Sequence, residues 1–465
     1  MRRIQQALLL GCALTLAGPN AGAAQNEGPL RLTLEDALGI AVGSNPGYRR
    51  ASNEAGLNGL EMQTVWLDRL LPQASLNLFN TGFTGNRQRT ATDNFGNPIA
   101  NPSADWVYFS STNQSLNLSW RLQGASLFND HRRQALTNQG RLVSQRRALT
   151  GLQVSVQRLY MDALEQRDLL AAEQELIDAR VIDLDVSERL FSLALRTRVD
   201  VLNAELAVEQ QRLQLRQQQA LSERALLSLR TGLGDDGLPA LDLADEPLPI
   251  FDPSSLDADR LVGAALRLNP ELEQARVAVE TSDLGLKEQR NLWWPRVDMG
   301  INVYRRTQLP RGESLFDVSF DESLDSQFFV QFSIPFFEGY FRNRQAAAQS
   351  AVQLDNDREA ERETRLRIEE TVRSTLLELS NQWESLRLAE RSLEIAEEAL
   401  RLAREEYRIG SRTFEDLRSS FNQEADTRRL VITSRHAFVD ALLALEDAVG
   451  SRVRPDATAP SQPEL

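Results

Sequence analysis

The side chains that most often carry chemistry are scarce in this sequence. It holds one cysteine, Cys12, one lysine, Lys287, and two histidines, His131 and His436. Catalysis by a nucleophile with a His partner, and transition-metal binding by His and Cys, both need more such side chains. The sequence also has no Gly-rich loop of the kind that cradles phosphates. We therefore expect no catalytic residue, no metal site and no cofactor, and hence no enzymatic activity.

Carboxylates are the abundant reactive groups, but they lie among arginines in a pattern typical of solvated helix faces. The sequence has 66 Asp and Glu against 52 Lys and Arg, a net charge of −14. Loss of residues 1–23, which hold Arg2 and Arg3 and no acids, would leave 50 basic residues and a net charge of −16. Phosphate binding needs the opposite sign, so nucleic acid is not an expected partner.

The first residues predict export from the cytoplasm. Two arginines precede an apolar stretch that runs from Ala7 to Gly18, and Ala21-Gly22-Ala23 forms an A-x-A cleavage site. The stretch is too short to span a bilayer, so we interpret 1–23 as a signal peptide. Cys12 lies inside it and is interpreted as an apolar-core residue rather than a lipid attachment site. No other segment reads as a transmembrane helix, so any membrane crossing would have to use strands.

The sequence indicates an internal duplication, in which one structural unit occurs twice. Landmarks of the first half recur in the second at a nearly constant offset. The matched pairs are Pro46 and Pro270, Pro72 and Pro295, Gly124 and Gly339, Leu202 and Leu417, and Gly234 and Gly450. We expect a first repeat at 24–234, a linker at 235–256, a second repeat at 257–450 and a disordered tail at 451–465. Each repeat should contain a helix, two strands and two long helices.

The predicted strands follow Pro72 and Pro295 and precede Gly124 and Gly339. In each of these four segments, apolar and polar residues alternate one by one, the pattern of a half-buried strand. An ordinary soluble sheet would give the same alternation, but the signal peptide and the polar face favour a membrane barrel. Because the smallest membrane barrels use about eight strands, four strands per chain require several copies.

The predicted long helices occupy the rest of each repeat. From Leu152 to Thr231 there is no Gly or Pro, and from Tyr340 to Val449 only Gly410 interrupts. Leu386, Leu393, Leu400 and Tyr407 recur every seven residues, which is the seam of a coiled coil. By itself, this pattern is strong evidence for the shape of the protein and weak evidence for its function.

Three segments carry a resemblance to a known family. The segment 32–38 with Asn45-Pro46 resembles the opening helix of the TolC-like outer-membrane efflux protein family. Residues 332–339 look like that family's passage from strand to helix, and 407–417 are similar to its turn between long helices. The resemblance implies a mainly α fold with membrane β: an internally duplicated, long antiparallel α-helical coiled-coil barrel. It further implies four β-strands per chain contributing to a trimeric 12-stranded outer-membrane β-barrel.

The resemblance also implies a place and partners. A homotrimer would sit in outer-membrane lipid and extend into the periplasm as the exit duct of a tripartite efflux or type I secretion system. Its partners would be a periplasmic adaptor (membrane fusion) protein and an inner-membrane pump of RND, ABC or MFS type. The alternative is a periplasmic coiled-coil scaffold or adaptor without a pore. The sequence does not identify the exported substrate.

By resemblance, a periplasmic gate would consist of Tyr407, Arg412, Asp416 and Asp200. Tyr407 continues the coiled-coil seam, and Arg412 follows the turn and could form an ion pair with a carboxylate on a neighbouring helix. Three copies of Asp416 would form an acidic ring, a common device for cation selectivity. The alternative is that these residues only cap and solvate a helical hairpin.

Further residues are expected at the tip turns and at the passages between strand and helix. Tip-turn and adaptor-contact candidates are Gly410, Ser411, Thr413, Phe414 and Leu417 in the second repeat, and Ala194, Leu195, Val199 and Leu202 in the first. The passage residues are Pro72, Gly124, Pro295, Pro335 and Gly339. Neither Ala194 nor Leu195 takes a left-handed turn as easily as glycine, so the first turn and the partner of Asp200 are left open. We expect the gate to depend mainly on the second repeat.

Overall fold

The computed structural model describes residues 30–89, 95–98, 100, 104–123, 126–235, 237–245, 247–291, 294–309, 324–334 and 339–453. The predicted signal peptide, Cys12, Gly124, Pro335 and the tail beyond Val453 lie outside these residues. The described chain is mainly helical, with few strands, which confirms the predicted fold class.

The elements follow one another in nearly the same order in each half of the chain, except that the first half has α3 after α2 and the second half has η1 before α6. The first half contains β1 (Leu30–Leu32), α1 (Leu34–Ser44), α2 (Pro46–Gly56), α3 (Asn58–Leu70), β2 (Gln73–Arg89), β3 (Ala104–Gln123), α4 (Ser126–Ser192) and α5 (Arg198–Leu233). The second half contains β4 (Leu241–Leu243), the 3-10 helix η1 (Pro253–Ser255), α6 (Ala258–Leu268), α7 (Pro270–Arg290), β5 (Arg296–Leu309), β6 (Asp325–Ser333), α8 (Tyr340–Arg408) and α9 (Phe414–Val449).

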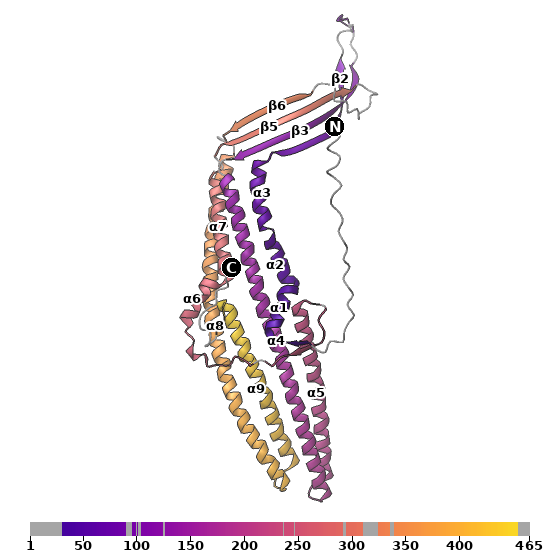
Figure 1. Cartoon of the computed structure of the whole chain (residues 1–465), viewed down its shortest axis with the longest axis vertical. Helices are drawn as coiled ribbons and strands as arrows, with labels where there is room; N and C mark the ends of the chain where they lie inside the picture. Colours follow the sequence, from indigo (N-terminus) through magenta and orange to yellow (C-terminus); the bar gives the residue numbers. More distant parts are fainter. Residues whose placement is uncertain are drawn as a thin grey trace, which may run out of the picture.

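The molecule is elongated, with the four-stranded sheet at one end and two helical hairpins at the other (Figure 1). The hairpins are α4 with α5 and α8 with α9, and their turns lie close to each other at the far end. α4 has 67 residues and α8 has 69, which at about 1.5 Å per residue corresponds to roughly 100 Å each. None of the described helices is both long and apolar enough to cross a membrane.

Asn-Pro motifs set where the helices near the middle begin. The side chain of Asn45 accepts hydrogen bonds from the backbone N–H groups of Gly47 and Tyr48, and Pro46 occupies the first helical position of α2. Asn269 and Pro270 repeat this arrangement at α7. Asn accepts the otherwise unpaired N–H groups of a helix start, and Pro has no N–H to leave unpaired there.

The sheet has the strand order β2-β3-β5-β6 and is antiparallel throughout. Three strands are longer than the alternating segments from which they were predicted: β2 has 17 residues, β3 has 20 and β5 has 14. The additional parts, such as residues 80–89 of β2, are rich in Asn, Thr, Gly and Arg and show no apolar alternation. Their pairing comes from backbone hydrogen bonds, which leave no mark in the hydrophobic pattern.

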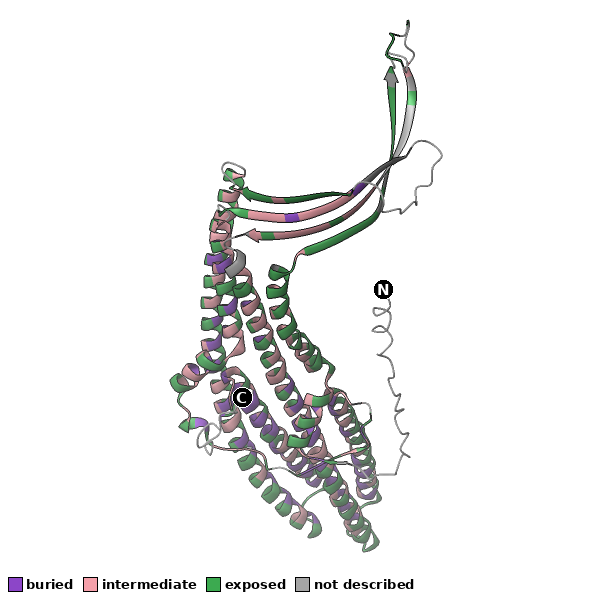
Figure 2. Cartoon of the chain, turned by 45° about the horizontal axis from the view of Figure 1, so that its top comes forward, coloured by how far each residue is buried: buried purple, intermediate pink, exposed green. Residues whose placement is uncertain are grey.

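The largest hydrophobic core lies in the middle of the molecule, in a region that we call the waist (Figure 2). There, residues 152–164 of α4 and 225–233 of α5 belong to the same core as 368–379 of α8 and 438–449 of α9. Here β1 and β4 form a short parallel pair that was not predicted. The hydroxyl of Tyr160 on α4 lies 3.0 Å from the carbonyl oxygen of Leu32 and 3.3 Å from that of Ala244. These contacts tie the linker between the two halves to the long helix α4.

Candidate functional site

The two tip turns, residues 193–197 and 409–413, have the same backbone hydrogen-bond pattern. The N–H of Leu195 donates to the carbonyl of Leu190 at 2.9 Å, and the N–H of Ser411 donates to that of Glu406 at 3.0 Å. Ala194 and Gly410 are both left-handed, with φ of 57° and 86°. The first turn therefore forms the same helix end without a glycine. A left-handed alanine costs about 1–2 kcal/mol, so this turn is strained where the second is not.

Asp200 and Asp416 form capping boxes at the starts of α5 and α9. The carboxylate of Asp200 accepts the N–H of Thr197 at 3.0 Å, and that of Asp416 accepts the N–H of Thr413 at 3.2 Å. In return, each threonine hydroxyl accepts the N–H of its aspartate. The hydrogen bonds from Thr413 hold the pKa of Asp416 below its ordinary value, so this exposed carboxylate stays charged.

Tyr407 is buried and connects the two hairpins. Its hydroxyl lies 3.1 Å from the hydroxyl of Ser187 on α4, and its ring packs edge-on against Phe414. Burial raises the pKa of Tyr407, so the phenol stays protonated and able to donate. The side chain of Tyr407 therefore lies inside the helix packing, as its place in the seven-residue seam predicts.

Arg196 in the first tip turn also contacts Tyr407, and the sequence analysis did not identify it. Its guanidinium lies 4.2 Å from the centre of the Tyr407 ring. The same guanidinium donates to the carbonyl oxygens of Tyr407 at 2.6 Å and of Arg412 at 2.7 Å. Arg196 therefore holds the two tips together through one cation–π contact and two charge-assisted hydrogen bonds. The repeat contained a signal for it, because Arg196 and Arg412 have the same separation along the chain as Gly234 and Gly450.

Arg412 itself stays within its own hairpin. Its Nε lies 2.5 Å from a carboxylate oxygen of Glu406 near the end of α8, and both side chains are partly exposed. Within one chain, the expected ion pair to a neighbouring helix is therefore absent at this described residue. An exposed pair of this kind contributes about 0–1 kcal/mol.

The predicted match between Leu202 and Leu417 is off by one residue. The capping boxes place Thr197 and Asp200 at the same turn positions as Thr413 and Asp416, which pairs Val201 with Leu417. Val201 and Leu417 are both buried, whereas Leu202 lies on the exposed face of α5 together with Val199.

The two tips therefore do not present matching apolar surfaces. Phe414 and Leu417, two of the adaptor-contact candidates, lie in a core with Leu400, Ala403 and Phe421 and are not exposed in the single chain. Leu195, Val199 and Leu202 are exposed in the single chain. The equivalent residues of the second tip, 216 positions later, are Ser411, Glu415 and Arg418, so the exposed face is apolar in the first tip and polar in the second.

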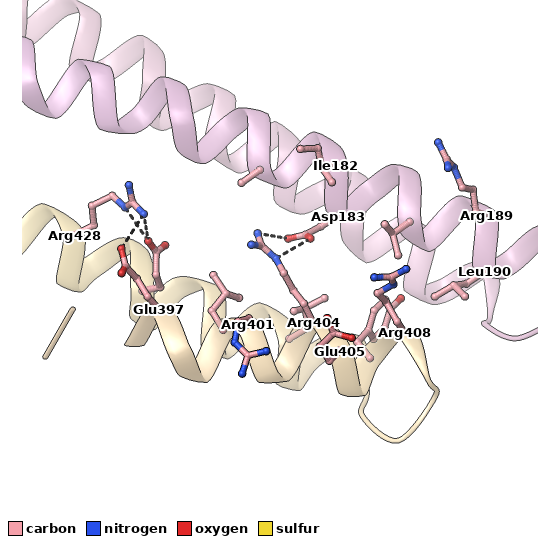
Figure 3. A pocket seen from close by; sticks show the side chains of 16 residues that line it. Ile182, Asp183, Arg189, Leu190, Glu397, Arg401, Arg404, Glu405, Arg408 and Arg428 are labelled. Atoms are coloured by element: carbon pink, nitrogen blue, oxygen red, sulfur yellow. Dashed lines mark hydrogen bonds and ion pairs between the residues drawn. The ribbon is translucent and has the colours of Figure 1, made fainter. Parts of the chain in front are cut away.

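A cleft of about 730 Å³ lies just above the tips, between α4 and the α8–α9 hairpin (Figure 3). Arg404 reaches across it from α8 to Asp183 on α4, with Nε 3.3 Å from a carboxylate oxygen. Burial raises the pKa of Asp183, and Arg404 opposes that shift. Deeper in the contact, Arg180 stacks on Phe421 and donates to Asn422 at 2.6 Å; burial lowers its pKa to about 10. Polar and charged groups thus hold the two hairpins together here.

The described passage residues lie between a helix and a strand or at the start of a helix. Gly339 precedes α8 with φ of 73°, a left-handed conformation that suits glycine. Pro72 lies between α3 and β2, and Pro295 lies between α7 and β5. Among the residues that the structure describes, no three His, Cys, Asp or Glu side chains are grouped to hold a metal ion.

Comparison with known proteins identifies relatives of this architecture. Residues 261–451 match the family model described as "Outer membrane efflux protein". No curated protein matches the sequence. The fold is similar to that of a membrane protein from Pseudomonas aeruginosa, with a TM-score of 0.68, 18% identity and coverage of 90% of each chain.

Two further structures are similar over nearly their whole length. CusC has a TM-score of 0.69 and 17% identity, covering 92% of this chain and 96% of its own. The open-state MtrE outer membrane channel of Neisseria gonorrhoeae has a TM-score of 0.66 and 16% identity, covering 92% and 91%. The predicted resemblance to TolC-like proteins is confirmed, in fold over most of the chain and in sequence over 261–451.

Proposed function

We propose that this TolC-like outer-membrane efflux protein is the passive exit duct of a tripartite efflux or type I secretion system. The signal peptide at 1–23 would export it, and three copies would form a duct from the outer membrane into the periplasm. The observation that carries the proposal is the separation of its parts. Four strands lie at one end, two helical tips lie at the other, and helices of 67 and 69 residues run between them.

The strand end suits outer-membrane lipid. On β6, the large apolar side chains Phe328, Val330 and Phe332 alternate with Phe329 and Gln331, and all three are more than half exposed in the single chain. Apolar side chains on one face are what a membrane strand presents to lipid. Four strands cannot close on themselves, and three chains would supply twelve.

The tip end suits a gate that an adaptor and a pump of RND, ABC or MFS type could open. Tyr407 and Arg196 hold the two hairpins of one chain together, and Asp200 and Asp416 place negative charge beside the turns. Arg412 lies at the same level, with its backbone already bonded to Arg196. We propose that docking separates these contacts, and that Leu195, Val199 and Leu202 are the apolar tip residues an adaptor would meet.

Reconstitution of the full chain into planar bilayers tests the duct. We expect a discrete conductance, together with a trimer that fractionates with the outer membrane and needs detergent for extraction. A protein that extracts without detergent and gives no conductance would be the periplasmic scaffold instead. The duct itself would perform no catalysis and would hold no cofactor.

A further inference from the structure

One face of the sheet is apolar and the other is polar. On β5, large apolar side chains occupy every second position, namely Val297, Met299, Ile301 and Val303. The positions between them are Asp298, Gly300 and Asn302. Successive side chains of a strand point to opposite faces, so these two sets lie on opposite faces of the sheet. In the proposed duct the apolar face meets lipid, and the polar face is therefore the inner wall.

The polar face continues across the neighbouring strands. Asn117 on β3 lies opposite Asn302 on β5 and opposite Ser75 on β2. Asn117 donates a hydrogen bond to the Ser75 hydroxyl at 3.3 Å, and Asn77 donates one to the Ser115 hydroxyl at 3.2 Å. A wall of amides and hydroxyls that bond to one another suits contact with water.

Phe329 on β6 is an aromatic side chain on this polar face. It lies opposite Gly300 in the register of β5 and β6. Two atoms of its ring lie 2.6 and 2.7 Å from the position that a Cβ atom on Gly300 would have. The ring therefore lies directly over the glycine, on the same face as Asp298 and Asn302.

Gly300 and Phe329 form a matched pair. A Cβ atom at position 300 would collide with the ring and would lie 3.1 Å from the carbonyl oxygen of Leu118. Glycine is disfavoured within a strand because it has no side chain to pack, and a ring packed over it offsets part of that cost. Gly300 is buried and Phe329 is partly exposed. One face of the ring is thus held against the backbone, while the side chain still reaches the inner wall.

A group of charges lies next to the ring on the same face. The carboxylate of Asp298 accepts hydrogen bonds from Arg121 on β3 at 3.0 Å and from Arg296 on β5 at 2.9 Å. The two arginine side chains are 70% and 49% exposed. Two guanidinium groups share one carboxylate, so this group has an excess of positive charge.

The ring and the guanidinium groups are close enough for one small molecule to contact both. Gly300 and Asp298 are two residues apart on one strand, which corresponds to about 6.6 Å. A planar ring system stacked on Phe329 can therefore place an acid group beside Arg121. Aromatic rings pack well on one another, and guanidinium groups bind carboxylates with charge-assisted hydrogen bonds.

We infer that Phe329, Arg121 and Arg296 form a cargo-binding site on the inner wall, and that it takes a planar aromatic anion. The inference rests on the proposed function and names a class of cargo for it. An aromatic cation would meet the same ring but would be repelled by the two arginines. A saturated anion would lose the stacking.

The site is suited to brief contacts. Its arginines are exposed, and exposed ion pairs contribute about 0–1 kcal/mol. Only one face of the Phe329 ring is open to a ligand. Conduction needs contacts that are favourable enough to admit a molecule and weak enough to release it. Three copies of the chain would place three such sites at one level of the duct.

Block of single-channel current tests the site, with the full chain in planar bilayers and naphthoate as the probe. Naphthoate should block the wild-type channel at a concentration about fivefold lower than its saturated analogue, decalin carboxylate, because only naphthoate can stack. Naphthylmethylammonium, an aromatic cation, should block less than naphthoate does.

Phe329→Leu removes the aromatic face and keeps an apolar side chain over Gly300, so the sheet should still form. The variant should raise the half-blocking concentration of naphthoate about fivefold and leave that of decalin carboxylate unchanged. Gly300→Ala should have the same effect, because its Cβ displaces the ring. The matched control is Phe328→Leu, on the opposite face of the same strand and 69% exposed, which should not change the block.

Arg121→Gln tests the charged part of the site. It should weaken the block by naphthoate and strengthen the block by naphthylmethylammonium. Equal block by naphthoate in the wild type and in Phe329→Leu, or equal block by the two anions, would overturn the site and leave the duct standing. A wild-type chain without discrete conductance would overturn the proposed function, and the site with it.

Discussion

At the scale of single residues, the tip depends on side chains that join the two hairpins. Arg196 contacts the ring and the backbone of Tyr407 and the backbone of Arg412. Arg412, its counterpart in the second repeat, pairs with Glu406 of its own hairpin. Arginine at equivalent positions thus makes different contacts in the two repeats. The predicted gate, which was expected to depend mainly on the second repeat, did not include Arg196 of the first.

Arg196→Ala should loosen the closed tip more than Arg412→Ala does. Two charge-assisted hydrogen bonds of about 1.5–3 kcal/mol each are lost in the first variant, and an exposed ion pair of about 0–1 kcal/mol in the second. Single-channel recording should show a higher conductance for Arg196→Ala and little change for Arg412→Ala. The reverse order would mean that Arg412 forms a contact between chains that outweighs those of Arg196.

The two turn residues predict opposite effects of exchanging alanine and glycine. Gly410→Ala should destabilise the second turn by about 1 kcal/mol, because a side chain is disfavoured at φ of 86°. Ala194→Gly removes the same strain from the first turn. Hydrogen exchange of tip peptides should become faster for Gly410→Ala and no faster for Ala194→Gly; slower exchange in Gly410→Ala would contradict the strain argument.

At the scale of elements, the contact between α4 and α9 joins the two halves of the chain through buried and partly buried ionisable groups. His436 on α9 is buried and bonds to Asp168 on α4 at 3.2 Å. Burial raises the pKa of the nearby Glu165, and the negative charges of Asp162, Asp440 and Asp168 add to the increase, while His436 opposes it. Burial likewise raises the pKa of Asp440. The ionisation of Glu165 and Asp440 is therefore disfavoured at this contact. Burial would also raise the pKa of Asp168, but hydrogen bonds to His436 and Arg167 hold it below its ordinary value.

This arrangement predicts a pH dependence. The pKa of Glu165 is higher in the folded state than its ordinary value of 4.5, so its contribution to stability is complete below that pH and is lost as the pH rises through the raised value. Glu165→Gln removes the ionisation. It should raise the melting temperature by roughly 1–2 °C at pH 7 and leave it unchanged at pH 4.

Glu398→Gln is the matched control for Glu165→Gln. A hydrogen bond from Arg401 holds the pKa of the exposed Glu398 below its ordinary value, so loss of this charge should not raise the melting temperature at pH 7. Equal behaviour of the two variants would show that the local environment of Glu165 has no effect on stability.

At the scale of the whole molecule, α5 and α8 each keep an exposed apolar face, and among the described residues the edge strands β2 and β6 have no further strand beside them. The chain has a well-packed waist and tip of its own, but its length and its open sides suit a ring of copies. In the proposed function, assembly and transport are linked, because a duct would exist only where a ring of copies closes.

Leu206→Asp should weaken that ring. It places a charge on the exposed apolar face of α5, and if the proposed trimer covers this face, burial of an unpaired carboxylate there is costly. The trimer should dissociate in detergent at a lower temperature than the wild type. Gln219→Asp adds the same charge to another exposed face of α5 and should leave the dissociation temperature within a few degrees of the wild type.

Much of the fold could be predicted from local patterns. Alternation located the starts or ends of the strands, the absence of Gly and Pro located the long helices, and Asn45-Pro46 marked a helix start. Strand lengths could not be predicted, because the outer part of β2 is polar on both faces. α4 begins at Ser126, next to the predicted passage residue Gly124, and it accommodates Gly140 and Gly151 within it.

The candidate site was predictable only in part. Tyr407 and the two aspartates were named by resemblance. The seven-residue seam also predicted that Tyr407 packs between helices, but the capping bonds of the aspartates to Thr197 and Thr413 were not predicted. The sequence by itself determined the duplication and the periodicities, because these follow from repeats and from local backbone geometry. Only the tertiary structure decided that Arg196 crosses to Tyr407, that Val201 and not Leu202 faces inward, and that α5 and α8 form the outer sides. These facts depend on how elements from opposite halves of the chain rotate and pack against each other, and no local pattern encodes that rotation.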